Sequence, residues 1–353
     1  MSKKKILFVV EAFGGGIFTY IVDLANELIK DFDVYIAYSV RPQTPHDFQE
    51  YFNKKVNLIE VKSFTREINP IKDLKAVIEI KKIAEGIKPD IIHLHSSKAG
   101  VIGRIAFNGN HIPLYYTPHG YSFLMKNYSN IKRTVFKGIE KVMSLRKCTT
   151  ISCSLGEHKE TLTITDNALY VNNGVNIEKL NALIENVEVK EHPFTVFTLG
   201  RICYQKNPIL FNQIAEAMPD TKFIWIGDGE LRDELKSENI EVTGWVEREE
   251  ALIRSANADV FLLTSLWEGL PISLLESMYM KKLCVVSDVI GNHDVISNGI
   301  NGYVCRNVQE YVKAINSVDT KEIINNAFDC IIDQYNTAEM VNQYNKIYNS
   351  KSK

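Results

Sequence analysis

The sequence predicts an α/β protein with two doubly wound domains. Short β-branched runs alternate with longer amphipathic segments, and this pattern pauses near residue 175 and restarts near residue 194. Such alternation predicts βαβ units and parallel sheets. A chain of 353 residues is long enough for two domains of ordinary size. We expect domains at residues 1–175 and 176–335, followed by a helix within residues 336–353 that can cross back to the first domain.

The first domain is predicted from short apolar runs and from longer segments with helical spacing of apolar residues. The expected strands are residues 6–10, 34–39, 56–61, 91–95, 114–117 and 149–153. The expected helices are residues 17–30, 71–88, 98–108 and 131–145. The segment Asn172-Asn-Gly-Val-Asn176 has turn chemistry that suits a hinge between the domains.

The second domain repeats the same order of elements. Its expected strands are residues 194–199, 223–226, 260–263 and 283–286, with a short strand and loop at 242–246. Its expected helices are residues 208–218 and a segment in which Pro271 suits the first turn. The final helix is expected at residues 338–348.

Composition indicates a soluble globular protein, because 45% of residues are hydrophobic and 24% are charged. No apolar run reaches the roughly 18 residues that a membrane-spanning helix needs. Met1-Ser-Lys-Lys-Lys leads into a short strand rather than the apolar core of a signal peptide. We therefore expect a cytoplasmic protein, and we expect no nucleic acid among its partners.

Two carboxylates, Glu268 and Glu276, draw attention to one edge of the second sheet. Glu268 is expected on the loop after strand 260–263, and Glu276 about a turn and a half into the next helix. Both can face the carboxyl edge of a parallel sheet, where open α/β folds bind ligands. They could grip hydroxyl groups. They could equally be a glutamate favoured by the helix dipole and a solvated loop glutamate.

Glycines and cations mark the loops that follow three other strands. Gly14-Gly15-Gly16 precedes a helix, where backbone N–H groups can approach an anion, although a tight turn explains these glycines equally well. The glycine spacing is not that of a dinucleotide fingerprint. Arg201 and Lys206 could bind a diphosphate or be solvated cations. Gly227 ends another strand, and the loop 242–246 could hold a flat base through its main chain.

Jointly, these motifs resemble the retaining glycosyltransferases of family four, which have the GT-B fold. The resemblance covers nearly the whole chain, in order and at the expected distances. Two further blocks, His95-Ser-Ser-Lys98-Ala-Gly100 and Tyr116-Thr-Pro-His119-Gly120-Tyr121, are similar to the CapM-like branch that builds bacterial capsules and exopolysaccharides.

The resemblance implies a role for each matching position. Arg201 and Lys206 would neutralise the donor diphosphate, Glu276 would bind the ribose, and Glu268 would hold hydroxyls of the donor sugar. His119 would lie beside the reacting sugar, although it could instead cap its own turn. The implied catalytic residues are His119, Arg201, Lys206 and Glu268. The implied donor-binding residues are Gly15, Gly16, Arg201, Lys206, Gly227, Val246, Glu268, Gly269, Leu270, Ser273, Leu274 and Glu276.

The implied reaction moves a sugar, of an N-acetylated or deoxy type, from a UDP-sugar to a saccharide acceptor on a lipid, undecaprenyl diphosphate. The resemblance implies front-face attack with retention, and no cofactor or metal. Two alternatives stay open: a non-hydrolysing nucleotide-sugar epimerase and a non-catalytic nucleotide-sugar-binding subunit. The epimerase normally needs catalytic acids that we cannot identify here, and binding alone needs fewer polar groups than the chain carries.

Two further expectations concern metals and membranes. We expect His93 and His95 to point to opposite faces of their strand, where they cannot share a metal. The stretch 123–147 interleaves lysines and arginines with apolar residues. It could rest on anionic headgroups at the inner face of the cell membrane, or be an ordinary surface helix with its apolar face in the core.

Overall fold

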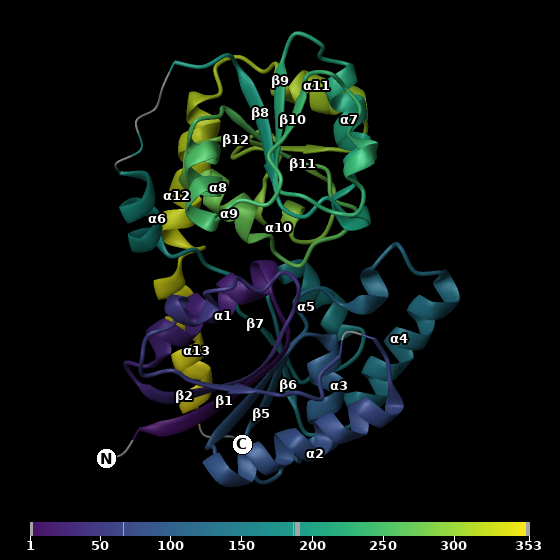
Figure 1. Cartoon of the computed structure of the whole chain (residues 1–353), viewed down its shortest axis with the longest axis vertical. Coiled ribbons are helices and arrows are strands. Elements are labelled where there is room, and N and C mark those ends of the chain that lie inside the picture. The colour runs from purple at the N-terminus through teal and green to yellow at the C-terminus, as the bar shows by residue number, and fades with distance from the viewer. Residues whose placement is uncertain (1–2, 66, 186, 188–190, 351–353) are drawn as a thin grey trace. The chain divides into compact units, whose positions relative to one another are not determined.

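The computed structural model describes residues 3–65, 67–185, 187 and 191–350. The chain forms two compact units (Figure 1). The first consists of residues 1–124, 128–173 and 337–353, and the second of residues 125–127 and 174–336. One crossing between the units lies within the segment 172–176, between residues 173 and 174, and the chain returns to the first unit between residues 336 and 337.

The described part of the first unit contains a parallel sheet of seven strands in the order β3-β2-β1-β4-β5-β6-β7. These strands are β1 (Lys4–Phe13), β2 (Phe32–Val40), β3 (Asn57–Glu60), β4 (Ile91–His95), β5 (Leu114–Thr117), β6 (Thr149–Ser152) and β7 (Ala168–Tyr170). The helices are α1 (Gly15–Leu28), α2 (Pro70–Ile87), α3 (Ser97–Ala106), α4 (Asn130–Met143), α5 (Leu155–Leu162) and α13 (Thr337–Asn349).

The interior strand β1 shows how this sheet is covered on both faces. Side chains alternate across a strand, so Phe8 and Val10 join one core and Leu7 and Val9 join another. The first core includes residues of α1 and α13, and the second includes residues of α2 and α3. Every residue of β1 from Ile6 to Val10 is fully buried, as expected for a strand between two helical layers.

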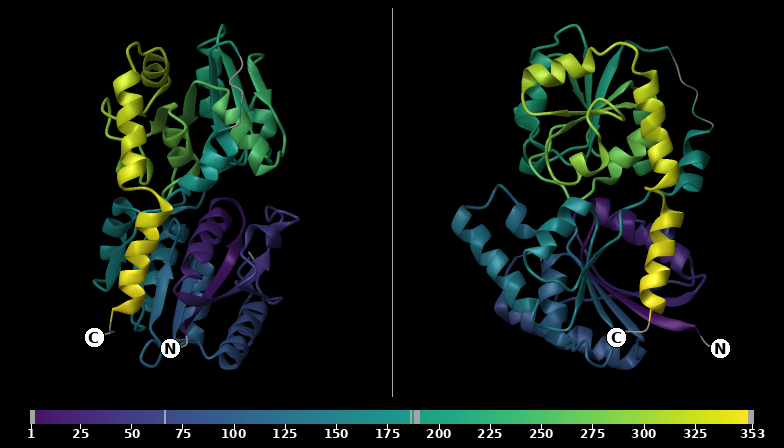
Figure 2. Two further views of the ribbon diagram at one scale, coloured as in Figure 1. Left: turned by 90° about the vertical axis from the view of Figure 1, so that its left-hand side faces the viewer. Right: turned by 180° about the vertical axis from the view of Figure 1, so that it is seen from behind.

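The C-terminal helix α13 is part of the first unit, although it follows the whole second unit in sequence. Figure 2 shows it in yellow running beside the first sheet. Its residues Met340, Tyr344 and Tyr348 are buried in the core that contains α1. The hydroxyl of Tyr344 lies 2.6 Å from that of Tyr20 on α1.

The described part of the second unit contains a parallel sheet of six strands in the order β10-β9-β8-β11-β12-β13. These strands are β8 (Thr195–Leu199), β9 (Lys222–Ile226), β10 (Ile240–Val242), β11 (Val260–Leu263), β12 (Leu283–Ser287) and β13 (Tyr303–Cys305). The helices are α6 (Ile177–Ile184), α7 (Pro208–Glu216), α8 (Arg248–Ala256), α9 (Ile272–Tyr279), α10 (Asn292–Val295), α11 (Val308–Ile315) and α12 (Lys321–Asp333).

The predicted parallel α/β architecture is confirmed, with some differences in its elements. The short strand expected at 242–246 was misplaced, because β10 ends at Val242 and the residues after it form a loop. The elements β7, β13, α5, α6, α8 and α10 to α12 were not predicted. No helix in the described ranges is both long and apolar enough to cross a bilayer.

Candidate functional site

Most of the predicted donor-binding residues of the second unit lie on the loops after β8, β9 and β11, which are neighbours in the sheet, or on α9, which follows the last of these loops. Arg201 follows β8, Gly227 follows β9, and Glu268 lies between β11 and α9. Because the strands are parallel, these loops leave the sheet at one edge. Val246 is half-buried on the loop between β10 and α8. The fold therefore brings separate sequence motifs to one carboxyl edge.

Lys206 and Glu268 form an ion pair at this edge, with 2.7 Å between Nζ and Oε1. Their side chains are only 17% and 8% exposed. Gln205 donates to the carbonyl of Trp267 at 2.9 Å and to Glu268 Oε2 at 3.3 Å. The hydroxyl of Thr264 donates to the carbonyl of Lys206 at 2.7 Å. The loops after β8 and β11 are thus joined, and Glu268 holds the ammonium group in place.

Arg201 is held less firmly. Its Nε lies 2.9 Å from Oε2 of Glu230, and both side chains are substantially exposed. Ion pairs of this kind contribute roughly 0 to 1 kcal/mol, so the guanidinium can exchange Glu230 for another anion at little cost. The sequence analysis did not identify Glu230 as a partner.

Glu276 is 2% exposed on α9, where its Oε1 pairs with the guanidinium of Arg248 on α8. The sequence analysis did not identify Arg248, since α8 itself was not predicted. A buried carboxylate needs such a partner, because burial without one is costly. The expected ribose contact would therefore use the oxygen atoms of a carboxylate that Arg248 already orients.

The loop before α9 carries the remaining predicted donor residues. Gly269 and Ser273 are half-buried, whereas Leu270 and Leu274 are buried. Pro271 precedes α9 without a side-chain hydrogen bond that caps the helix. An uncapped helix N-terminus leaves backbone N–H groups that can bind an oxyanion. The side chains of Leu270 and Leu274 are buried in the core, so these two residues would contact a ligand through their main-chain atoms.

Gly227 has a packing role that sequence reasoning did not anticipate. Its φ of 136° is unfavourable for any residue with a side chain, and a Cβ there would lie 2.3 Å from the carbonyl oxygen of Gly200. Its N–H donates to the hydroxyl of Thr243 at 3.1 Å. Close approach of three loop backbones at the carboxyl edge explains this glycine without a ligand.

In the first unit, Gly15 and Gly16 begin α1, and Gly14 precedes it without a side-chain cap. Gly15 has a φ of 57°, which explains the absence of a side chain. A Cβ built on Gly15 or Gly16 meets no atom within 4 Å. The helix N-terminus is therefore open to its surroundings, as an anion-binding turn requires.

His119 lies on the loop after β5 with a φ of 54°. Its Nε2 lies 3.1 Å from Nδ1 of His95, and burial lowers the pKa of its imidazole to about 3. Burial also lowers the pKa values of His93 and His95 well below their ordinary range. These rings are therefore neutral near pH 7.

The expected placement of His93 and His95 on opposite faces of β4 was wrong. Their ring centroids are 4.1 Å apart. Residues two apart on a strand share a face, because side chains alternate with a period of two. Even so, the described residues contain no group of three or more His, Cys, Asp or Glu side chains arranged to hold a metal.

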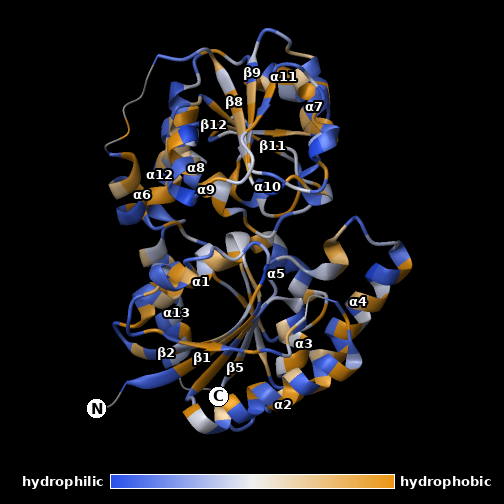
Figure 3. Cartoon of the chain, viewed as in Figure 1, coloured by the Kyte–Doolittle hydropathy of each residue, from blue (hydrophilic) through white to orange (hydrophobic). Residues whose placement is uncertain are grey.

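The helix α4 makes up most of the basic stretch 123–147, and it exposes several of its apolar residues. Ile131 and Val142 are 79% and 58% exposed, Val135 and Ile139 extend the same stripe, and Leu145 just after the helix is 85% exposed. Figure 3 shows apolar and charged residues interspersed along the helix. Lys132 and Lys141 on α4, and Arg146 just after it, are also exposed. Other apolar residues of the stretch, Phe123 and Phe136, pack on the core of the first unit, so both alternatives stay open for the stretch as a whole.

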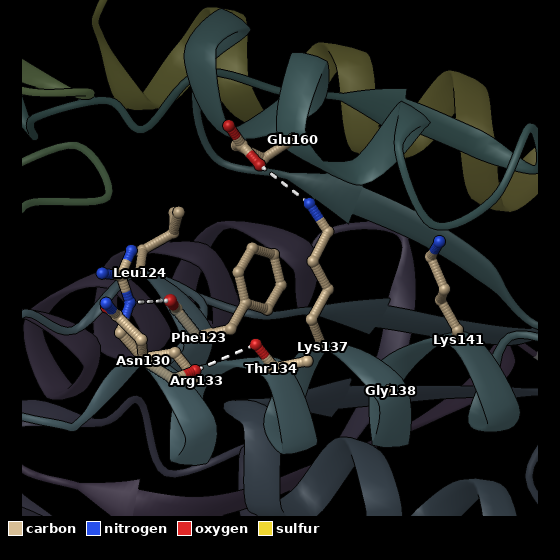
Figure 4. Close-up of a pocket in the computed structure, with 9 residues that line it drawn as sticks. All are labelled: Phe123, Leu124, Asn130, Arg133, Thr134, Lys137, Gly138, Lys141 and Glu160. Atoms are coloured by element: carbon tan, nitrogen blue, oxygen red, sulfur yellow. Dashed lines mark hydrogen bonds and ion pairs between the residues drawn. The ribbon is translucent and has the colours of Figure 1, made fainter.

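One flank of α4 borders a hollow of about 550 Å³ (Figure 4). Arg133, Lys137 and Lys141 line it on successive turns, beside Phe123. Lys137 lies 3.6 Å from Glu160 of α5, and Arg133 donates to the carbonyl of Phe123 at 2.7 Å. An exposed apolar stripe therefore lies next to a cationic hollow.

Comparisons with known proteins agree over both units. Residues 14–179 match the model described as Glycosyltransferase Family 4, and residues 193–320 match Glycosyl transferases group 1. The chain is 30% identical over 336 residues, covering 85% of each protein, to the UDP-Gal:alpha-D-GlcNAc-diphosphoundecaprenol alpha-1,3-galactosyltransferase of Escherichia coli. It is 24% identical to an uncharacterized 41.2 kDa protein in the cps region of Klebsiella pneumoniae, covering 98% and 99% of the two chains.

Among solved structures, the sucrose-phosphate synthase of Thermosynechococcus elongatus superposes with a TM-score of 0.79. The two share 15% identity, and the match covers 98% of each chain. At this identity the likeness concerns the fold, which is GT-B.

Proposed function

The chain is a glycosyltransferase of family 4, dependent on a nucleotide sugar, and from this membership we propose that its donor is a UDP-sugar and its acceptor an undecaprenyl-diphosphate-linked saccharide. The related Escherichia coli enzyme is named for a UDP-sugar and a diphosphoundecaprenol acceptor, which supports both assignments. A relative from a cps region supports a role in bacterial capsule or exopolysaccharide synthesis. The sugar class that we propose is an N-acetylated or deoxy hexosamine.

One observation carries the assignment of the donor site: Arg201, Lys206 and Glu268 lie on adjacent loops at one edge of the second sheet. Lys206 and Arg201 are the proposed ligands of the diphosphate. Glu268 orients Lys206 and offers its second oxygen to sugar hydroxyls. Glu276, oriented by Arg248, is the proposed ribose ligand.

In the proposed reaction, the acceptor hydroxyl attacks the anomeric carbon on the face from which UDP departs. The bond between that carbon and the phosphate oxygen breaks, and its electron pair leaves with UDP. A phosphate oxygen of the leaving group takes the acceptor proton. The two cations stabilise the charge that develops on the diphosphate, so catalysis consists mainly of positioning and electrostatics. Because Arg201 and Lys206 supply this charge, we propose no metal and no cofactor.

The proposed acceptor requires the enzyme to work at a membrane surface. The exposed apolar residues of α4, together with the exposed cations Lys132, Lys141 and Arg146 of the same stretch, give it the composition of an interfacial helix. Anionic headgroups attract such lysines and arginines by about 1 kcal/mol each. We therefore place the enzyme on the inner face of the cell membrane, with α4 as the contacting surface.

Nucleotide binding tests the donor assignment directly. A ligand that binds only the folded protein raises its stability with concentration. We expect UDP and UDP-sugars to raise the melting temperature of the protein more than GDP or ADP at equal concentration. A preference for GDP or ADP would overturn the choice of UDP while leaving the family membership intact.

A further inference from the structure

A buried cluster of imidazole and phenol groups lies behind His119 in the first unit. His95 on β4 is fully buried, and its Nδ1 lies 3.1 Å from Nε2 of His119. The two rings are stacked, with centroids 5.3 Å apart. His95 Nε2 is also buried, and it has no hydrogen-bond partner among the described residues.

The hydrogen bond between these neutral rings restricts their tautomers. If His119 donated from Nε2, His95 would carry its own proton on Nε2, as a buried N–H without an acceptor. If His95 donates from Nδ1, its Nε2 is only a lone pair without a donor. Buried N–H groups without partners are rarer than under-satisfied acceptors in proteins. The geometry therefore favours donation from His95 Nδ1 to His119 Nε2.

Donation from His95 Nδ1 to His119 Nε2 determines which atom His119 presents to a ligand. A neutral imidazole carries one proton, so His119 then carries it on Nδ1. This atom has no hydrogen-bond partner among the described residues and is not among the fully buried polar atoms. Because His119 is only half-buried, its Nδ1 is left as an N–H donor for a ligand.

We propose that His95 is a positioning residue that holds His119 in the Nδ1–H tautomer, so that His119 donates a neutral hydrogen bond to an oxygen atom of the transferred sugar. This inference rests on the proposed function, in which His119 contacts the sugar. His95 acts through His119 and touches no substrate itself.

The surroundings hold both rings in this arrangement. Tyr20 of α1 meets the His119 ring edge-on, with centroids 4.7 Å apart, and the Tyr20 hydroxyl pairs with that of Tyr344 on α13. The N–H of Gly120, next to His119, donates to Glu157 at 2.6 Å. The C-terminal helix thus supports the ring that we place beside the sugar.

A second residue of α13, Tyr348, also contacts the histidine cluster. His93 Nδ1 lies 2.6 Å from the hydroxyl of Tyr348, and its Nε2 lies 2.9 Å from the hydroxyl of Thr117. Both ring nitrogens of His93 therefore have hydrogen-bond partners, whereas only Nδ1 of His95 has one. The His93 ring in turn packs against His95, which leaves His95 little freedom to rotate away from His119.

Nuclear magnetic resonance of the wild-type protein tests the tautomer without relying on activity. Long-range correlations between ring protons and ring nitrogens, in protein labelled with ¹⁵N-histidine, distinguish protonated from unprotonated nitrogens. A His119→Asn variant assigns the signals. We expect the pattern of a protonated Nδ1 and an unprotonated Nε2 for His119 near pH 7. The reverse pattern, or a doubly protonated ring, would overturn the proposal.

Two substitutions of His95 test the consequence for transfer. The side-chain amide of His95→Asn places an N–H near the position of Nδ1, whereas His95→Leu fills the space without a donor. We expect the Asn variant to keep kcat within about threefold and the Leu variant to lose about tenfold, the effect of one hydrogen bond. The affinity of both variants for UDP should match that of the wild type.

The outcomes separate this inference from the proposed function. Equal kcat values for folded Asn and Leu variants would contradict positioning by His95. If the Leu variant does not fold, the tautomer measured in the wild type decides the matter. If the wild type transfers no sugar from any UDP-sugar, the proposed function fails, and the resonance pattern still reports the tautomer.

Discussion

At the residue scale, Lys206 connects the structure most directly to the chemistry. Its ammonium group is held by Glu268 in a largely buried pair, and we place it against the departing diphosphate. We predict that Lys206→Ala lowers kcat about 100-fold, or ~2.7 kcal/mol of barrier, as for removal of one preorganised charge stabiliser. Steady-state kinetics at saturating donor measures the effect.

The control for this substitution is Lys222→Ala, which removes an exposed lysine paired with Glu241 at 2.8 Å in the same unit. Its kcat should equal that of the wild type, since an exposed pair contributes little. Near-wild-type turnover of Lys206→Ala at saturating donor would remove Lys206 from the proposed mechanism.

Glu276 gives a prediction about binding rather than rate. If its carboxylate grips the ribose, Glu276→Ala should weaken UDP binding about tenfold in calorimetric titrations, the effect of lost hydrogen bonds to a charged acceptor. Arg248→Ala serves as the comparison, because it removes the partner of the carboxylate and leaves the carboxylate itself. An unchanged dissociation constant in Glu276→Ala would argue against a ribose contact.

Sequence reasoning identified the charged residues that we propose for the donor site but not their partners. Arg201, Lys206 and Glu268 stood out because they follow predicted strands, and Glu276 because it lies in the helix after one of them. Glu230 and Arg248 did not, because their pairing depends on how loops and α8 meet after folding. The histidine cluster was missed through a wrong assignment of strand faces, although the spacing of His93 and His95 contained the signal.

At the element scale, strand prediction succeeded where burial left a clear pattern. The bounds of β4, β5 and β11 agree with those predicted, since each is a short run that is buried throughout. The helices α5 and α8 are only eight and nine residues long and rich in polar residues, so tertiary packing determines them more than local pattern does. The role of α13 in the first core also depends on tertiary contacts.

The helix α4 carries a prediction about membranes. We expect the wild-type protein to float with anionic liposomes at low salt and to float less as salt screens the lysines. Val142→Glu should abolish flotation, because it places a charge in the exposed apolar stripe. The melting temperature should not change, since Val142 is already 58% exposed.

The matched control is Ile78→Glu on α2, which replaces a similarly exposed apolar residue of the same unit. This variant should float like the wild type. Loss of flotation in Ile78→Glu with retention in Val142→Glu would move the contact surface from α4 to α2. A wild-type protein that remains unbound at low salt would exclude membrane docking through either helix.

At the scale of the whole molecule, the buried histidines make the stability of the first unit depend on pH. His93 and His95 are neutral in the folded unit because burial lowers their pKa values, whereas in the unfolded chain they protonate below about pH 6.5. The unfolded state therefore binds more protons below that pH. The free energy of unfolding therefore has its full value above pH 6.5. Below that pH it falls by about 1.4 kcal/mol per pH unit for each of these two histidines.

Amide hydrogen exchange of β1 and β4 at pH 7.5, 6.5 and 5.5 measures this dependence. We expect His93→Gln to reduce the slope and His111→Gln, at an exposed position, to leave it unchanged. Fluorescence of Trp225, Trp245 and Trp267 reports on the second unit, which lacks the histidine cluster, and provides an internal comparison. The same pH slope in the wild type, His93→Gln and His111→Gln would contradict the assignment of this dependence to the buried histidines.

Transfer of labelled sugar to a lipid acceptor tests the central claim most directly. The purified protein is incubated with a panel of radiolabelled UDP-sugars and a saccharide-diphosphoundecaprenol, and the lipid extract is counted and its anomeric linkage determined. We predict that at least one UDP-sugar labels the lipid with an α-linkage, and that Lys206→Ala transfers about 100-fold more slowly. Conversion of UDP-sugars without any lipid product, or a product of inverted configuration, would contradict the account.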